Sequence, residues 1–148
     1  MSDFLIDTNV LVYSYDAVDP TKQQRAREVL SDLATSGRAS LSVQVLGEFF
    51  TIVTRKIALP LTLEDARLTV QDFTASFPVL SLTPATVLQA IDVSQRFQRS
   101  YWDGLLIAAA RLAGIDHLLS EDMQDGVSYG GVRVLNPFAP NFDLSFLA

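Results

Sequence analysis

The chain has 148 residues, 49% of them hydrophobic, and its 17 acidic and 11 basic side chains give a formal net charge of −6. This length fits one domain, and the hydrophobic content excludes a largely disordered chain. Because the sequence contains no cysteine, disulfides and thiolate metal sites are excluded, and any metal must bind to oxygen ligands or to the single His117. The negative charge argues against broad, charge-driven binding of nucleic acid but is compatible with a local basic groove.

No apolar run approaches the ~20 residues that are needed to cross a membrane. The N-terminus also lacks the basic and apolar segments of a signal peptide. We therefore expect a cytoplasmic protein without membrane contact.

Short apolar segments alternate with helical patterns in the first half of the chain. Phe4–Ile6 is predicted to be a buried strand. Asp19 and Pro20 are typical of a helix start, and Gly37 is expected to end that helix. The next predicted elements are a strand at Ala39–Leu41, a helix from Ser42 to about Lys56, and a helix to about Ala75 that begins with a capping box from Thr62 to Asp65.

The second half continues the alternation. Its predicted elements are a strand at Phe77–Leu82, a helix from Thr83-Pro84 to about Phe97, a helix from Ser100 to Ala113, and strands at His117–Leu119 and Val132–Leu135 joined by a polar loop. We place one domain at residues 1–138 and a phenylalanine-rich tail at 139–148 that packs on the domain or on a partner. Alternating strands and helices predict an α/β fold, whose parallel sheet binds ligands outside the carboxyl ends of its strands.

Four acids occupy related positions in this pattern, and each also has an ordinary structural explanation. Asp7 follows the first strand and could cap a helix that starts near Val10. Glu48 could be a solvated residue of its helix. Asp103 could complete a capping box with Ser100, although its helix is apolar almost all round, which favours a partly buried acid with a partner. Asp122 could belong to an acidic turn.

Taken together, the four acids favour a metal site. A parallel sheet would bring the acids that follow its strands to one edge. Two carboxylates about 4 Å apart repel by about 4 kcal/mol at an effective dielectric of 20, so a cluster must bind protons or a cation. An all-oxygen ligand set favours Mg²⁺ or Mn²⁺.

The segments that carry these acids resemble those of the PIN-domain ribonucleases, and most closely the VapC-type toxins of toxin–antitoxin pairs. The matching segments occur in the order and at the spacing of that family: "FLIDTNVLVY", "EFFTIVTRK", "YWDGLLIAAARLAG" and "HLLSEDMQDG". The resemblance covers about residues 3–138. It implies a three-layer α/β/α fold with a short-stranded parallel sheet, and an active site of clustered acids that binds one or two Mg²⁺ or Mn²⁺ ions.

By the same resemblance, the catalytic and metal-binding acids are Asp7, Glu48, Asp103 and Asp122, with Asp125 as a weaker ligand. Thr8, Asn9 and Ser120 would support them, because Asp7, Thr8 and Asn9 form the family's DTN motif and Ser120 retains the hydroxyl of its usual threonine. We expect Glu121 to be solvated and Trp102 to be in the core rather than to stack on bases. Candidate ligands of RNA phosphates are Arg25, Arg55, Arg96 and Arg99.

The resemblance further implies endonucleolytic cleavage of single-stranded RNA, a homodimer, and neutralisation by a cognate antitoxin. Contact surfaces for these partners are expected at Pro60–Ala75 and at the tail. Three alternatives stay open: an RNA-processing nuclease without an antitoxin, a non-catalytic RNA- or protein-binding module, and an aspartate phosphotransferase with Asp7 as its nucleophile. Such phosphotransferases generally carry a second aspartate where this chain has Asn9.

Overall fold

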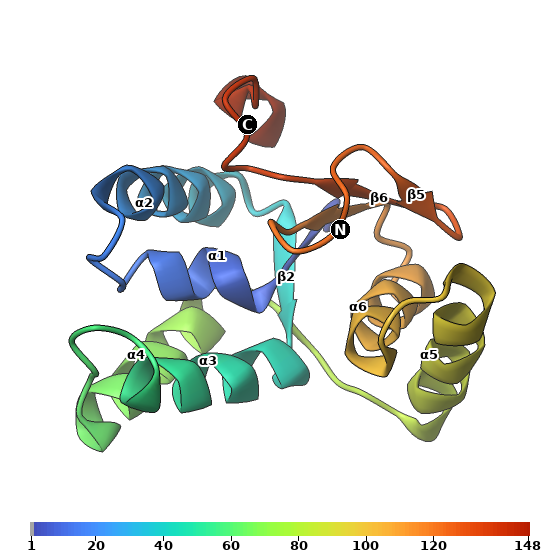
Figure 1. Cartoon of the computed structure of the whole chain (residues 1–148), viewed down its shortest axis with the longest axis horizontal. Helices are drawn as coiled ribbons and strands as arrows, with labels where there is room; N and C mark the ends of the chain where they lie inside the picture. The colour runs from blue at the N-terminus through green and yellow to red at the C-terminus, as the bar shows by residue number, and fades with distance from the viewer. Residues whose placement is uncertain (1) are drawn as a thin grey trace.

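The computed structural model describes residues 2–148, and a six-stranded sheet lies at its centre (Figure 1). The strands are β1 (Phe4–Ile6), β2 (Ala39–Ser42), β3 (Val79–Leu80), β4 (His117–Leu119), β5 (Ser128–Tyr129) and β6 (Val132–Leu135). Their order is β3-β2-β1-β4-β6-β5, and all neighbouring pairs are parallel except β5 and β6. The predicted α/β fold with a short-stranded parallel sheet is confirmed.

Helices cover both sides of this sheet. They are α1 (Thr8–Tyr13), α2 (Pro20–Ser36), α3 (Val43–Arg55), α4 (Leu63–Ser76), α5 (Pro84–Phe97) and α6 (Tyr101–Leu112), followed by the short 3-10 helix η1 (Leu144–Leu147). Figure 1 shows α1 to α4 on one side of the strands and α5 and α6 on the other. The strands are too short to contribute much surface each, so the core forms where their buried faces meet these helices.

The helix starts follow the predicted capping residues. The Asp19 side chain accepts from the backbone N–H of Lys22 at 3.1 Å, and Gly37 ends α2 with a φ of 69°, which glycine adopts without strain. The Thr62 hydroxyl caps α4 by accepting from the backbone N–H of Asp65 at 3.1 Å. These local signals therefore fix the helix boundaries as the sequence predicts.

The sheet differs from the prediction in two strands. β3 contains only Val79–Leu80 of the predicted Phe77–Leu82, because only this part pairs with β2. β5 lies within the segment predicted as a loop. Gly130 and Gly131 have φ values of 58° and 91°, and two central residues with positive φ form the tight turn that folds β5 back onto β6.

The contact between α5 and α6 is unusually close at Gly104. A Cβ atom at this position would lie 2.6 Å from the backbone carbonyl oxygen of Ala90, so no side chain fits there without a shift of α5. Trp102, which we expected in the core, is 62% exposed, and this expectation is wrong. Two residues of helix rotate the side-chain direction by about 200°, so Trp102 points away from the contact that Gly104 makes.

The tail packs on its own chain. Leu147 is fully buried, and the ring of Phe146 lies 5.6 Å from that of Phe4 and 5.5 Å from that of His117. The Arg38 guanidinium donates to the carbonyl oxygens of Phe146 and Ala148. The domain boundary at residue 138 stays a prediction. Within residues 2–148, no helix is both long and apolar enough to cross a membrane.

Candidate metal centre at the carboxyl ends of the strands

Asp7 lies at the end of β1, where the chain turns into α1. Asp7 is only 6% exposed, and its carboxylate caps α1 by accepting from the backbone N–H of Thr8 at 2.7 Å. The hydroxyl of Ser120, which directly follows the neighbouring strand β4, donates to the other carboxylate oxygen at 2.7 Å. The capping role and a functional role are therefore compatible, because each uses a different oxygen of Asp7.

Asn9 connects the two strand ends. Its side-chain amide donates to Asp7 at 3.3 Å, to the Ser120 hydroxyl at 3.3 Å and to Asp122 at 3.1 Å. Its carbonyl oxygen accepts from the backbone N–H of Glu121 at 3.3 Å. One amide side chain thus holds the segment after β4 against the start of α1, and it brings Asp122 toward Asp7.

Glu48 reaches the same place from the second turn of α3. One carboxylate oxygen accepts from the Thr8 hydroxyl at 2.7 Å, and the other accepts from the side-chain amide of Gln44 at 2.7 Å. α3 starts directly after β2, so the sheet sets the position of this helix as well. Glu48, which the sequence predicts as one of the clustered acids, therefore lies beside Thr8 and the end of β1.

These side chains line a cleft of about 270 Å³, which we call the acid cleft. Its lining residues are Asp7, Thr8, Asn9, Val12, Tyr13, Asp16, Glu48, Ile52, Lys56, Ile57, Glu121 and Asp122. Acidic groups predominate, and Lys56 is the cation among them. Lys56 follows Glu48 by eight residues, which places both on one face of the helix, so helical spacing could have identified it from the sequence.

The pKa of Asp7 is raised from 3.8 to about 6. Burial of the carboxylate is the largest cause, and the negative charges of Asp122 and Glu48 add to it, whereas the hydrogen bonds from Ser120 and Thr8 lower the pKa. A raised pKa means that the ionised carboxylate lacks a compensating positive charge. A cation bound in the acid cleft would supply that charge.

Asp103 does not line the acid cleft. Its carboxylate, 27% exposed, accepts from the Arg99 guanidinium at 3.1 Å, and Ser100 caps α6 through the backbone N–H of Asp103. The sequence predicts a partner for this acid, and Arg99 is that partner. Asp103 is therefore bound to a residue that just precedes its own helix, and it lies apart from the acids that follow the strands.

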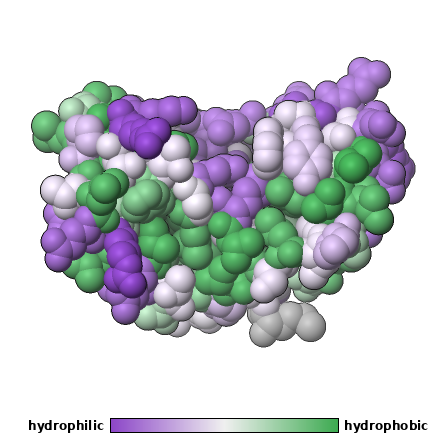
Figure 2. All heavy atoms as spheres, turned by 90° about the horizontal axis from the view of Figure 1, so that it is seen from below, coloured by the Kyte–Doolittle hydropathy of each residue, from purple (hydrophilic) through white to green (hydrophobic). Residues whose placement is uncertain are grey.

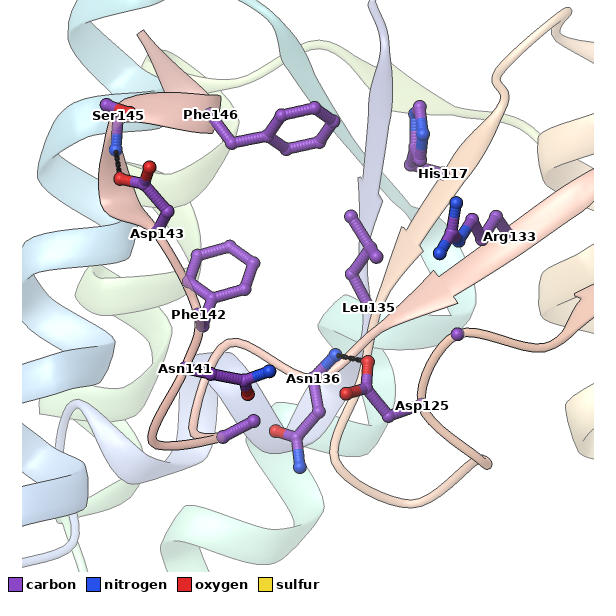
Figure 3. Close-up of a pocket in the computed structure, with 12 residues that line it drawn as sticks. His117, Asp125, Arg133, Leu135, Asn136, Asn141, Phe142, Asp143, Ser145 and Phe146 are labelled. Carbon is purple, nitrogen blue, oxygen red and sulfur yellow. Dashed lines mark hydrogen bonds between the residues drawn. The ribbon is translucent and has the colours of Figure 1, made fainter.

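Asp125 lies in a different cavity, of about 420 Å³, beneath the tail. Figure 3 shows its carboxylate next to Asn136, and it accepts a hydrogen bond from the backbone N–H of Asn136 at 2.9 Å. Arg133 and His117 lie further along the same cavity. The aromatic rings of Phe142 and Phe146 point into this space from the opposite wall (Figure 3). The structure therefore does not bring Asp125 together with Asp7.

The environment of Glu121 corrects the expectation that this residue is solvated. Its carboxylate accepts from the Tyr13 hydroxyl at 2.6 Å and pairs with the Lys22 ammonium at 2.5 Å. These contacts arise because α1 and α2 pack beside the segment after β4, an arrangement that sequence spacing does not reveal. The hydrogen bond to Glu121 is also the main cause that raises the pKa of Lys22, and it raises the pKa of Tyr13.

The four arginines that we considered as phosphate ligands lie outside the acid cleft. Arg99 is paired with Asp103, and the Arg96 guanidinium lies over the Phe97 ring at 5.0 Å. Arg55 is exposed near the end of α3, and Arg25 lines a second pocket that also contains Lys22. Two cations that the sequence analysis does not single out lie at the acid cleft: Lys56 lines it, and Lys22 pairs with Glu121 at its edge.

The donor groups of the acid cleft fit a hard divalent cation. Asp7, Glu48 and Asp122 offer carboxylate oxygens, and Asp7 is a buried acid with two negative neighbours. Within residues 2–148, however, no three histidine, cysteine, aspartate or glutamate side chains already converge as a ready-made metal site. The ligands match the metal in type and charge, and their side chains must adjust to hold it.

Comparison with known proteins identifies the family. The PIN domain family model matches residues 4–124, so the chain belongs to the PIN domain family. This match includes the β1 and β4 ends and all four acids expected from the sequence. No functionally curated protein matches the chain in sequence.

Several solved structures share the fold. A toxin–antitoxin complex from Klebsiella pneumoniae matches with a TM-score of 0.64 and 16% identity over 90% of this chain and 96% of that one. VapC20 of Mycobacterium tuberculosis, described as a sarcin–ricin loop cleaving toxin, has a TM-score of 0.63 and 21% identity over 80% and 89% of the two chains. DNA-bound VapBC from Salmonella typhimurium has a TM-score of 0.61 and 18% identity over 90% and 97%.

Proposed function

We propose that this protein is a metal-dependent endoribonuclease that cleaves phosphodiester bonds of single-stranded RNA. The observation that carries the proposal is the buried Asp7 carboxylate, which lies at the end of β1 among Glu48 and Asp122 in a chain of the PIN domain family. A charged carboxylate that lacks a positive partner is costly in a protein interior. Binding of a divalent cation offsets that cost.

Asp7, Glu48 and Asp122 would hold Mg²⁺ or Mn²⁺. When bound, such an ion lowers the pKa of a coordinated water and stabilises the charge that develops on the phosphate. Ser120 and Thr8 keep Asp7 and Glu48 oriented through their hydroxyl hydrogen bonds. Asn9 holds Asp122 within reach of Asp7, and Asp103 would join as a fourth acid once Arg99 releases it.

The nuclease would act as the toxin of a toxin–antitoxin pair. Support comes from the fold, because structures with the same architecture include a toxin–antitoxin complex from Klebsiella pneumoniae and VapBC from Salmonella typhimurium. In this proposal a cognate antitoxin covers the acid cleft and keeps RNA out. RNA cleavage then follows release of the antitoxin.

The contact surface for an antitoxin or a second copy of the chain would lie on the lower face of the molecule in Figure 1, where α3, α4 and α5 are exposed. Exposed apolar side chains lie here at Leu59, Leu63, Leu68 and Leu88. Figure 2, which views the molecule from this side, shows extensive apolar surface interrupted by polar groups. This supports Pro60–Ala75 as a contact surface more than the tail, whose Leu147 is already buried.

The decisive experiment is an RNA cleavage assay. We expect the purified chain to cleave single-stranded RNA in the presence of Mg²⁺ or Mn²⁺. Cleavage should stop when EDTA is added. Asp7→Asn is expected to reduce the rate by about a thousandfold or more, because metal catalysis contributes several kcal/mol. Cleavage that persists in EDTA and in Asp7→Asn would refute the metal site.

Growth tests the toxin assignment separately. Expression of the chain without an antitoxin is expected to arrest growth, and Asp103→Ala is expected to relieve the arrest. Equal toxicity of wild type and Asp103→Ala, at equal protein levels in the cell, would contradict the role of Asp103.

A further inference from the structure

A second pocket lies beside the acid cleft, between the first turns of α2 and the start of the tail. Its volume is about 610 Å³, and we call it the Lys22–Phe138 pocket. It is lined by Pro20, Thr21, Lys22, Gln24, Arg25, Glu28, Phe138, Ala139 and Pro140. It combines two cations with an aromatic ring, whereas the acid cleft is predominantly acidic.

The two cations of this pocket are only partly occupied by internal partners. The Lys22 side chain, 33% exposed, pairs with Glu121 and donates to the Tyr13 hydroxyl at 3.3 Å. The Arg25 side chain, 28% exposed, lies 4.0 Å from Glu28 and 3.4 Å from the carbonyl oxygen of Phe142. Ion pairs this open to solvent contribute about 0–1 kcal/mol. A phosphate group can therefore compete for both cations.

Phe138 supplies an apolar surface next to these cations. Its ring packs edge-on against Tyr13 at a centroid distance of 5.0 Å, and the Lys22 ammonium lies 5.9 Å from its centroid. The contact with Tyr13 fixes the ring, and the part of Phe138 that lines the pocket remains open. A fixed aromatic ring beside cations is the arrangement on which single-stranded nucleic acids stack their bases.

Lys22 connects the pocket to the acid cleft. Tyr13 and Glu121 line the acid cleft, and both contact Lys22, which lines the neighbouring pocket. A strand bound at the acids can thus continue past Glu121 to Lys22 and Phe138. Lys56 is the cation that lines the acid cleft itself.

We propose that the Lys22–Phe138 pocket is the subsite for a nucleotide that flanks the cleaved phosphodiester. Lys22 and Arg25 bind its phosphate, and Phe138 stacks on its base. The assignment rests on the proposed nuclease function and adds the direction in which the RNA leaves the acids. It also explains how a chain with a net charge of −6 can hold RNA, because the cations lie beside the acids rather than over the whole surface.

RNA binding without cleavage tests this subsite. The full chain carrying Asp7→Asn, in EDTA, is titrated with a fluorescently labelled single-stranded RNA at several salt concentrations. Adding Arg25→Gln is expected to weaken binding about three- to tenfold and to reduce the salt slope by about 0.7, the value for one phosphate contact on a single strand. Adding Phe138→Leu, which keeps an apolar side chain, is expected to weaken binding about fivefold or more through lost stacking.

Arg67→Gln is the matched control, because Arg67 is an exposed arginine on α4 and its removal changes the net charge equally. Melting temperatures of all variants verify folding. Two results would overturn the subsite: an RNA affinity that is unchanged in Arg25→Gln and Phe138→Leu, or one that falls equally in Arg67→Gln. In either case the pocket would instead be a candidate for contact with a protein partner. Because binding is measured without metal, this result is independent of the cleavage assay on wild type, which alone decides the proposed function.

Discussion

The acid cleft and the start of α6 hold their acids in different ways. In the acid cleft, Asp7 is buried and receives hydrogen bonds from Ser120, Thr8 and Asn9, which come from two adjoining strand ends. At the start of α6, Asp103 is half-buried and contacts Arg99, four residues earlier in the chain. One acid is fixed by the sheet, the other by its immediate neighbours in sequence.

This difference shows what a parallel sheet contributes to a site. β1 and β4 pair in register from Phe4 with His117 to Ile6 with Leu119, so the residues that follow them must meet. The position of Asp103 depends on a half-exposed ion pair that contributes about 0–1 kcal/mol. The sheet thus fixes where the strand-end acids lie, and Asp103 is the acid that can be repositioned at low cost.

The largest expected effect is the pH dependence of stability that Asp7 imposes without metal. Because its pKa rises from 3.8 to about 6 on folding, its contribution is fully favourable below pH 3.8 and is lost as the pH rises through about 6. Ionisation then costs the native state about 3 kcal/mol. In EDTA, the free energy of unfolding of Asp7→Asn minus that of wild type should increase by about 2–3 kcal/mol from pH 4 to pH 8.

Asp103→Asn is the matched substitution for that comparison, since it removes an acid that has an internal cation as its partner. We expect it to change the free energy of unfolding by at most about 1 kcal/mol at pH 8. Urea titrations at both pH values measure the two differences. If the unfolding free energy of Asp7→Asn relative to wild type did not increase between pH 4 and pH 8, ionisation of Asp7 would not destabilise the native state.

A smaller effect is expected from the two serines beside these acids. Ser120→Ala removes the hydroxyl that donates to the buried Asp7 carboxylate and should cost about 1–3 kcal/mol of unfolding free energy. Ser100→Ala removes only the cap of α6 and should cost about 1 kcal/mol. RNA cleavage should also fall more in Ser120→Ala, and the reverse order would mean that α6, not the sheet, sets the site.

The smallest expected effect is on the metal requirement. Arg99→Gln frees Asp103 from its ion pair, so the Mg²⁺ concentration for half-maximal RNA cleavage should fall by up to about fivefold. Arg96→Gln, on the last turn of α5, is the control. A higher Mg²⁺ requirement in Arg99→Gln would show that Arg99 positions Asp103 for metal binding instead of competing for it.

The strand-end part of the site was predictable because it follows from local signals. An apolar triplet before Asp7 and another before Ser120 identify two strands, and parallel pairing brings their ends together. The helix caps at Asp19 and Thr62 could also be predicted from the sequence, since each cap involves residues only three positions apart. Such short-range patterns depend on neighbouring residues alone, so the sequence is enough to predict them.

The contacts that sequence reasoning missed depend on how helices pack. Glu121 meets Lys22 only because α2 lies beside the segment after β4, a separation of 99 positions in the chain. Trp102 is exposed because the α5–α6 contact uses the other side of its helix, which hydrophobicity alone does not reveal. The β5–β6 hairpin, in contrast, has a local signal in its two turn glycines, so it could have been predicted from the sequence.

The close approach of Gly104 to Ala90 has a mechanical consequence. Since a Cβ atom at Gly104 would lie 2.6 Å from the Ala90 carbonyl oxygen, α6 cannot move closer to α5 at this point unless α5 shifts as well. Asp103 is the adjoining residue, and the outer face of α5 carries the exposed side chains of Leu88 and Ile91. Binding of a partner to that outer face would therefore press on the helix that Gly104 contacts, next to Asp103.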